Sequence, residues 1–117
     1  MEFEIVTFRE PSHELLDILE ALEIAIFEQP YAREKLSKEL ARKQNLIALI
    51  AKTAENPVGF KVGFEMTTTL FYSWIGGVIP EYRKHGIAAR LMKQQHQLAE
   101  EAGFSVSVRM NWNREPI

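Results

Sequence analysis

Apolar and polar residues alternate in two stretches of this 117-residue chain. In residues 58–66 and 104–110 every second side chain is apolar, and the residues between are polar or glycine. Successive side chains of a strand point to opposite faces, so this period of two predicts strands with one face against a core. Residues 3–8 and 70–78 mix β-branched and aromatic residues and predict two more strands, and the apolar run at 46–52 predicts a buried one.

Three other segments carry apolar residues at helical spacing. The first follows Ser12, whose side chain is suited to cap a helix, and is expected to end or bend at Pro30. The second covers residues 31–42 and is more polar. The third covers residues 87–102 and is expected to begin directly after the strand that Pro80 stops, with Met92 as core filler on its inner side.

The predicted order is βααβββαβ, which indicates a single α/β (α+β) domain over residues 1–117 with a mixed, mainly antiparallel sheet. The strands that flank the last helix are expected to pair in parallel, as a βαβ crossover. Gly76 and Gly77 lie inside a predicted strand, where they favour a bulge or the close approach of a ligand; a simple bend is the alternative.

Composition excludes several functions. A net charge of −2 offers no global basic field for nucleic acid or an anionic membrane, and no apolar run approaches the roughly 20 residues of a membrane span. The chain has no cysteine, so it has no disulfide, thiolate metal site or cysteine nucleophile. Its three histidines show no metal-ligand spacing, so no metal is predicted. The start lacks the features of a signal peptide, and a cytoplasmic location is expected by default.

The junction between the 70–78 strand and the last helix has the composition of a phosphate cradle. A helix start leaves backbone N–H groups without intrahelical partners, and the helix dipole makes that point electropositive. Gly86 and Ala88 are small where a diphosphate would approach the backbone, and Arg83, Lys84 and Arg90 add positive charge. The alternative is an ordinary strand-to-helix turn with a solvated basic rim.

The pattern Arg83-x-x-Gly86-x-Ala88, after Val78-x-Pro80, resembles the signature of the GNAT superfamily of acetyl-CoA-dependent N-acetyltransferases. The predicted order matches that fold from its first strand through its fifth, while its fourth helix and last two strands do not follow within the 117 residues. The resemblance implies acetyl-CoA as co-substrate, with the pantetheine arm along Gly76 to Ile79. The implied cofactor-binding residues are Gly76, Gly77, Val78, Ile79, Arg83, Lys84, His85, Gly86, Ile87, Ala88, Ala89 and Asn113.

Catalytic residues are harder to predict. If Met66 pairs with Leu70, Tyr72, Trp74 and Gly76 share one strand face, and Tyr72 falls where some family members carry a catalytic Glu. Tyrosine, with an ordinary pKa near ~10, is a poor base at neutral pH, so packing or substrate contact is the simpler interpretation. Glu28 could line the acceptor cleft, although a solvated surface glutamate is the simpler reading. The family's frequent thiolate-protonating Tyr lies in the missing fourth helix.

The leading hypothesis is an N-acetyltransferase that transfers acetyl directly from acetyl-CoA to an amine of a small molecule or peptide. The alternative is a catalytically inactive acyl-CoA-binding or regulatory module, and the third possibility is an interaction domain without a ligand. The apolar face and unpaired edge of the 104–110 strand predict a homodimer.

Overall fold

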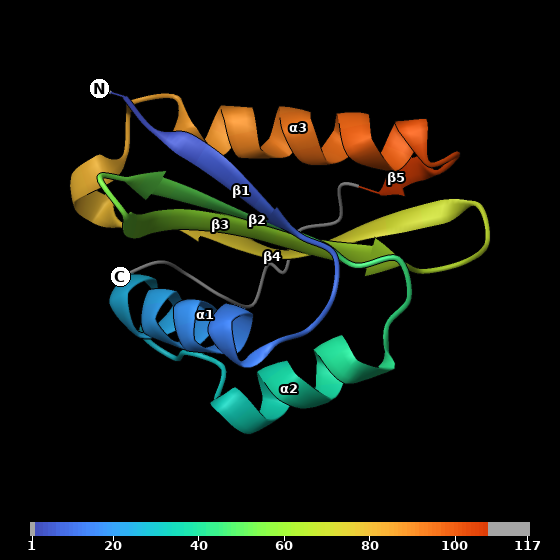
Figure 1. Cartoon of the computed structure of the whole chain (residues 1–117), viewed down its shortest axis with the longest axis horizontal. Helices are drawn as coiled ribbons and strands as arrows, with labels where there is room; N and C mark the ends of the chain where they lie inside the picture. The colour runs from blue at the N-terminus through green and yellow to red at the C-terminus, as the bar shows by residue number, and fades with distance from the viewer. Residues whose placement is uncertain (1, 108–117) are drawn as a thin grey trace.

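The computed structural model describes residues 2–107, which form one five-stranded sheet between two layers of helices (Figure 1). The strand order is β1-β2-β3-β4-β5, with β4 and β5 parallel and the other neighbours antiparallel. Helix α3 covers one side of the sheet, and α1 and α2 cover the other. The elements are β1 (Glu4–Phe8), α1 (His13–Ile26), α2 (Arg33–Arg42), β2 (Ile47–Thr53), β3 (Asn56–Glu65), β4 (Leu70–Val78), the 3₁₀ turn η1 (Pro80–Tyr82), α3 (Ile87–Glu101) and β5 (Ser105–Ser107). The predicted fold class and order are confirmed.

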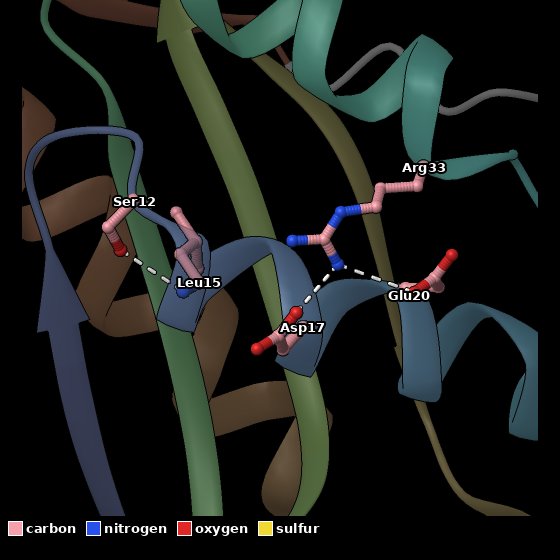
Figure 2. Close-up of polar contacts among 5 residues, drawn as sticks. All are labelled: Ser12, Leu15, Asp17, Glu20 and Arg33. Atoms are coloured by element: carbon pink, nitrogen blue, oxygen red, sulfur yellow. Dashed lines mark hydrogen bonds and ion pairs between the residues drawn. The ribbon is translucent and has the colours of Figure 1, made fainter.

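Helix α1 begins as predicted but ends earlier than Pro30. The Leu15 N–H donates to Ser12 Oγ at 3.1 Å, which satisfies one of the unpaired donors of the first turn (Figure 2). Helix α1 ends at Ile26, and the extended backbone of Phe27 closes it. Termination by Pro30 is therefore wrong, because the chain has already left the helix before the proline.

An ion pair joins α1 to the start of α2. Arg33 Nη1 lies 2.6 Å from Asp17 Oδ1 and 3.4 Å from Glu20 Oε1 (Figure 2). The carboxylates raise the pKa of Arg33, and the hydrogen bond that Arg33 donates to Asp17 is the main cause. The pair is exposed to solvent, so it orients the two helices more than it stabilises them.

The α1/α2 side of the sheet is filled with apolar side chains. Inward residues of β3 at alternate positions, Phe60, Val62 and Phe64, contact the buried stripes of α1 and α2. An aromatic series continues across this side: Tyr31 stacks on Trp74, and Phe64 contacts both Trp74 and Tyr72, each at a centroid distance of 5.7 Å. This side is a packed core, and its residues Ile26, Phe27 and Trp74 also line a cavity beside β4.

Helix α3 packs on the other side with a stripe of four buried residues at a period of four: Ile87, Leu91, Gln95 and Ala99. Gln95 Nε2 donates to the Ile47 carbonyl at 3.1 Å and so ties the helix to β2. Met92 follows Leu91 by one position, which rotates it off this stripe by about 100°. It is 42% exposed, so its assignment to the core was wrong.

Strand β4 contains a bulge. Met66 pairs with Leu70 as predicted, the Met66 N–H donating to the Leu70 carbonyl at 2.8 Å. Along β3, however, Gly63 pairs with Ser73 and Val62 pairs with Ile75, so Trp74 is an extra residue.

The bulge reverses the faces of the residues that follow it. A Cβ on Gly77 would meet Ile26 and Phe27 of the α1 side, whereas one on Gly76 would meet the Lys61 side chain. Lys61 alternates along β3 with Phe60 and Val62 and so faces the opposite side from them. The prediction that Gly76 shares a face with Tyr72 and Trp74 is therefore wrong.

Candidate functional site

A cavity of about 750 Å³ runs along the second half of β4. One wall is β4 with two neighbouring residues of β3, and another is α3 from Ile87 to His96. The end of α1, at Ile26 and Phe27, completes the lining, and the loop between β4 and α3 forms the mouth. Most of the predicted donor-binding residues lie together here: Gly76, Gly77, Val78, Arg83, Lys84, Gly86, Ile87, Ala88 and Ala89. Ile79 and His85 do not line the cavity, and Asn113 lies outside the described residues.

The mouth of the cavity is a helix start with free donors. A 3₁₀ turn and a loop separate β4 from α3. The prediction that the helix begins directly after Pro80 is therefore wrong. Gly86 is the N-cap residue with φ +79°, and no side chain caps the helix. A left-handed conformation here turns the chain sharply into α3, and a Cβ on Gly86 would meet no protein atom within 4 Å. The first N–H groups of α3 therefore face open space, which suits an anion.

The positive charges around this mouth are not equivalent. Arg83 Nε donates to the Val78 carbonyl at 3.0 Å, which fixes the guanidinium at the end of β4. Lys84 is exposed with φ +69°, beside Gly86. Arg90 instead lies over the Phe3 ring at 4.7 Å and does not line the cavity. Its predicted contribution to the cradle is wrong, because its position in α3 directs it toward β1.

Neither weak catalytic candidate lies in the cavity. Tyr72 is half-buried and contacts Phe64 edge to face, so it is a packing residue of the α1/α2 side. Glu28 is exposed after the end of α1 and is not a lining residue. No Asp or Glu occurs among the described residues that line the cavity.

Polar residues that were not predicted as site residues also line the cavity, among them Lys61, Ser73 and His96. Lys61 is half-buried, and desolvation lowers its pKa. Ser73 is 5% exposed, and its Oγ has no hydrogen-bond partner; the buried Nε2 atom of His96 also has none. For Lys61 the only sequence feature that could have indicated its position was the alternation of faces along the strand. No local feature of the sequence marked Ser73 or His96 as cavity-lining residues.

Another missed residue, Glu23, has a structural role. It is a fully buried carboxylate in α1, and its Oε1 accepts a hydrogen bond from the Tyr31 N–H at 2.7 Å. This bond holds the connection between α1 and α2 against the helix. Glu23 does not line the cavity.

Metal and membrane features were also sought in the described part of the chain. No cluster of three or more His, Asp or Glu side chains that could hold a metal ion occurs within residues 2–107. None of the helices described combines the length and apolar character that crossing a bilayer requires.

The sequence and the fold were compared with those of known proteins. Residues 12–115 match the Acetyltransferase (GNAT) family. The chain therefore belongs to the GNAT family of acetyltransferases, as the signature at Arg83 to Ala88 predicted. No curated protein sequence matches the chain.

Solved structures with this fold include several acetyltransferases. The ribosomal-protein-S18-alanine N-acetyltransferase of Escherichia coli has a TM-score of 0.76 at 13% identity, over 92% of this chain and 68% of that one. An aminoglycoside acetyltransferase from an uncultured soil metagenomic sample has a TM-score of 0.69 at 22% identity, over 93% and 76%. The PaiA N-acetyltransferase of Thermoplasma acidophilum, in complex with coenzyme A, has a TM-score of 0.69 at 20% identity, over 89% and 76%. At these identities the likeness is one of fold.

Proposed function

We propose that this domain transfers an acetyl group from acetyl-CoA to the amine of a small molecule or peptide. The observation that carries the proposal is the cavity itself, which begins at the uncapped start of α3 and continues along β4. Membership of an acetyltransferase family and a fold neighbour in complex with coenzyme A support the same reading.

The residues present fit such a donor. Backbone N–H groups from Gly86 to Ala89 are available to the diphosphate, and Arg83 and Lys84 supply the charge. The backbone of Gly76 to Ile79 would bond the pantetheine amides. His85 and Asn113 remain predicted contacts. When bound, acetyl-CoA supplies an activated thioester carbonyl.

Transfer would be direct, from thioester to amine. The chain has no cysteine, and Ser73 Oγ has no hydrogen-bonded base to activate it. Initial-rate kinetics should therefore give intersecting lines; parallel lines or a trapped acetyl-protein would contradict direct transfer.

A catalytically silent acyl-CoA-binding module is the second candidate. It is favoured by the lack of Asp and Glu among the described lining residues, since a protonated amine needs a base before it attacks. Mass spectrometry of an amine panel incubated with acetyl-CoA separates the two: acetylated product supports the enzyme, and CoA binding without product supports the silent module.

The test of the donor site is calorimetric titration with CoA. Gly86→Val should abolish binding, because its side chain would fill the open space at the cradle and strain a left-handed residue. Gly103→Val is the matched control: Gly103 has φ +95°, equally open surroundings and no place in the cavity. Unchanged affinity in Gly86→Val, or equal losses in both variants, would contradict the cradle.

We also propose that the protein is a cytoplasmic homodimer that uses the β5 edge of the sheet. Strand β5 is the last strand in the sheet order, and such edges pair readily with another chain. The rest of the predicted strand, to Met110, lies outside the described residues. Light scattering over a hundredfold concentration range should give the dimer mass, and a constant monomer mass would exclude it; fluorescence microscopy of a tagged chain tests the location.

A further inference from the structure

Two residues that line the cavity carry buried polar atoms without hydrogen-bond partners. Ser73 Oγ and His96 Nε2 are both buried, both residues line the cavity, and neither atom has a hydrogen bond. A buried polar atom left unpaired destabilises the fold, so two such atoms in one cavity require an explanation.

The two residues lie at the same depth. Helix α3 follows β4 and returns the chain to pair β5 in parallel with it, so α3 runs back along β4. At about 1.5 Å per residue, His96 lies roughly 15 Å along α3 from Gly86. At about 3.3 Å per residue, Ser73 lies roughly 16 Å back along β4 from Val78. Both residues therefore lie back from the cradle end of the cavity, by roughly 15 Å along α3 for His96 and by roughly 16 Å along β4 for Ser73.

This depth matches the length of the donor's arm. The pantetheine chain from phosphate to sulfur has the backbone length of about four extended residues, or roughly 14 Å. A donor with its diphosphate at Gly86 and its arm along the cavity therefore ends beside Ser73 and His96.

We propose that Ser73 Oγ–H and His96 Nε2–H donate hydrogen bonds to the sulfur of the donor and stabilise it as it leaves. This inference rests on the proposed function. In the transfer, the amine nitrogen bonds to the thioester carbon, the carbon–sulfur bond breaks, and its electron pair stays on sulfur. The proton that the amine loses passes to solvent, so neither residue has to give up its own proton.

The surroundings favour a negative sulfur. The charged or titratable described residues that line the cavity, besides His96, are Lys61 on β3 and Tyr82, Arg83 and Lys84 at the mouth. No carboxylate is among them, so nothing described there opposes a thiolate. Lys61 faces the same side of the sheet as Ser73, because it pairs with Gly76, two ladder positions from the Gly63–Ser73 pair.

The test compares the affinities of CoA and desulfo-CoA, which lacks only the sulfur. By calorimetry the parent protein should bind CoA about tenfold more tightly, because the two donors are paired only when sulfur is present. Ser73→Ala and His96→Leu should bring this ratio toward one, and His96→Gln, which keeps a side-chain donor, should restore part of it. Where acetylation is measurable, Ser73→Ala and His96→Leu, which each remove one donor, should also lower kcat by about tenfold to a hundredfold.

Ser37→Ala and His13→Leu are matched controls on exposed helix positions and should keep the parent ratio. Circular dichroism checks folding, and Ser73→Ala, the smaller change, retains the test if His96→Leu fails to fold. A ratio near one in the parent, or a ratio that neither substitution changes, would overturn the inference while leaving CoA binding intact. Failure of the parent to bind CoA at all would instead overturn the proposed function, and this inference with it.

Discussion

The two sides of the sheet are built from the same strands and differ most where they meet β4. Toward α1 and α2, Trp74 joins a continuous series of aromatic contacts with Tyr31 and Phe64. Toward α3, the neighbouring positions carry Ser73 and Gly76, which line the cavity, while Phe71, Ile87 and Leu91 belong to a second buried core. Because a strand alternates its faces, one segment can complete a core and line a cavity at the same time.

The largest expected effect is on the free energy of unfolding, and it separates a buried core position from an exposed position that lines the cavity. Leu19 is fully buried in α1, and Leu19→Ala should lower the free energy of unfolding by about 2–5 kcal/mol through lost burial and a cavity. Met92→Ala, at an exposed position that lines the α3 cavity, should cost less than about 1 kcal/mol. Urea denaturation measures both. Similar losses for the two variants would show that Met92 is packed as closely as Leu19.

A smaller effect is expected at the start of α1. Ser12→Ala removes the side-chain acceptor for the Leu15 N–H and should cost about 1 kcal/mol. Ser37 lies in the interior of α2 on its exposed face, so Ser37→Ala should be neutral or slightly stabilising. Thermal unfolding of the pair checks this. If Ser37→Ala lowers the stability as much as Ser12→Ala does, the loss of the helix cap is not the cause of the destabilisation in Ser12→Ala.

Periodicity predicted the buried face of the α1/α2 side of the sheet well, but it predicted the residues that line the cavity poorly. The strict alternation in residues 58–66 identified β3 and its buried face, and Ser12 marked the start of α1. The signature from Arg83 to Ala88 located the cavity mouth, since small residues and a helix start are local features. The bulge at Trp74 was not predictable in position, because it depends on register with β3. Consequently the face of Gly76 was assigned wrongly.

Ser73 and His96 were missed for a related reason. They are distant in sequence and line one cavity only because α3 runs back along β4. Arg90 and Met92 illustrate the converse: each fits a local pattern, a basic helix start or an apolar stripe, but the rotation of α3 on the sheet directs both elsewhere. Local patterns define elements, and packing decides which side chains share a site.

The smallest expected effect is the dependence of folding stability on pH that Lys61, on the α3 side of the sheet, causes. Its pKa is lowered by burial, so the charged form is disfavoured in the folded state relative to the unfolded one. Well below the folded pKa both states are protonated, and this cost is present in full. As the pH rises through the folded pKa toward the unfolded value, near 10.5, the folded state releases its proton first. The unfolded state then binds more protons, so stability rises with pH over that window.

Lys61→Met removes this cost and should be more stable than the parent at neutral pH, with the difference narrowing as the pH approaches 10.5. Urea midpoints of both proteins at several pH values between 7 and 10.5 measure it, and Lys38→Met on the exposed face of α2 controls for loss of a lysine. If the difference in urea midpoint between Lys61→Met and the parent is the same at every pH, Lys61 is solvated in the folded protein. If the difference in stability between Lys61→Met and the parent narrows only in the absence of CoA, the bound donor supplies the negative charge that Lys61 lacks among the described residues.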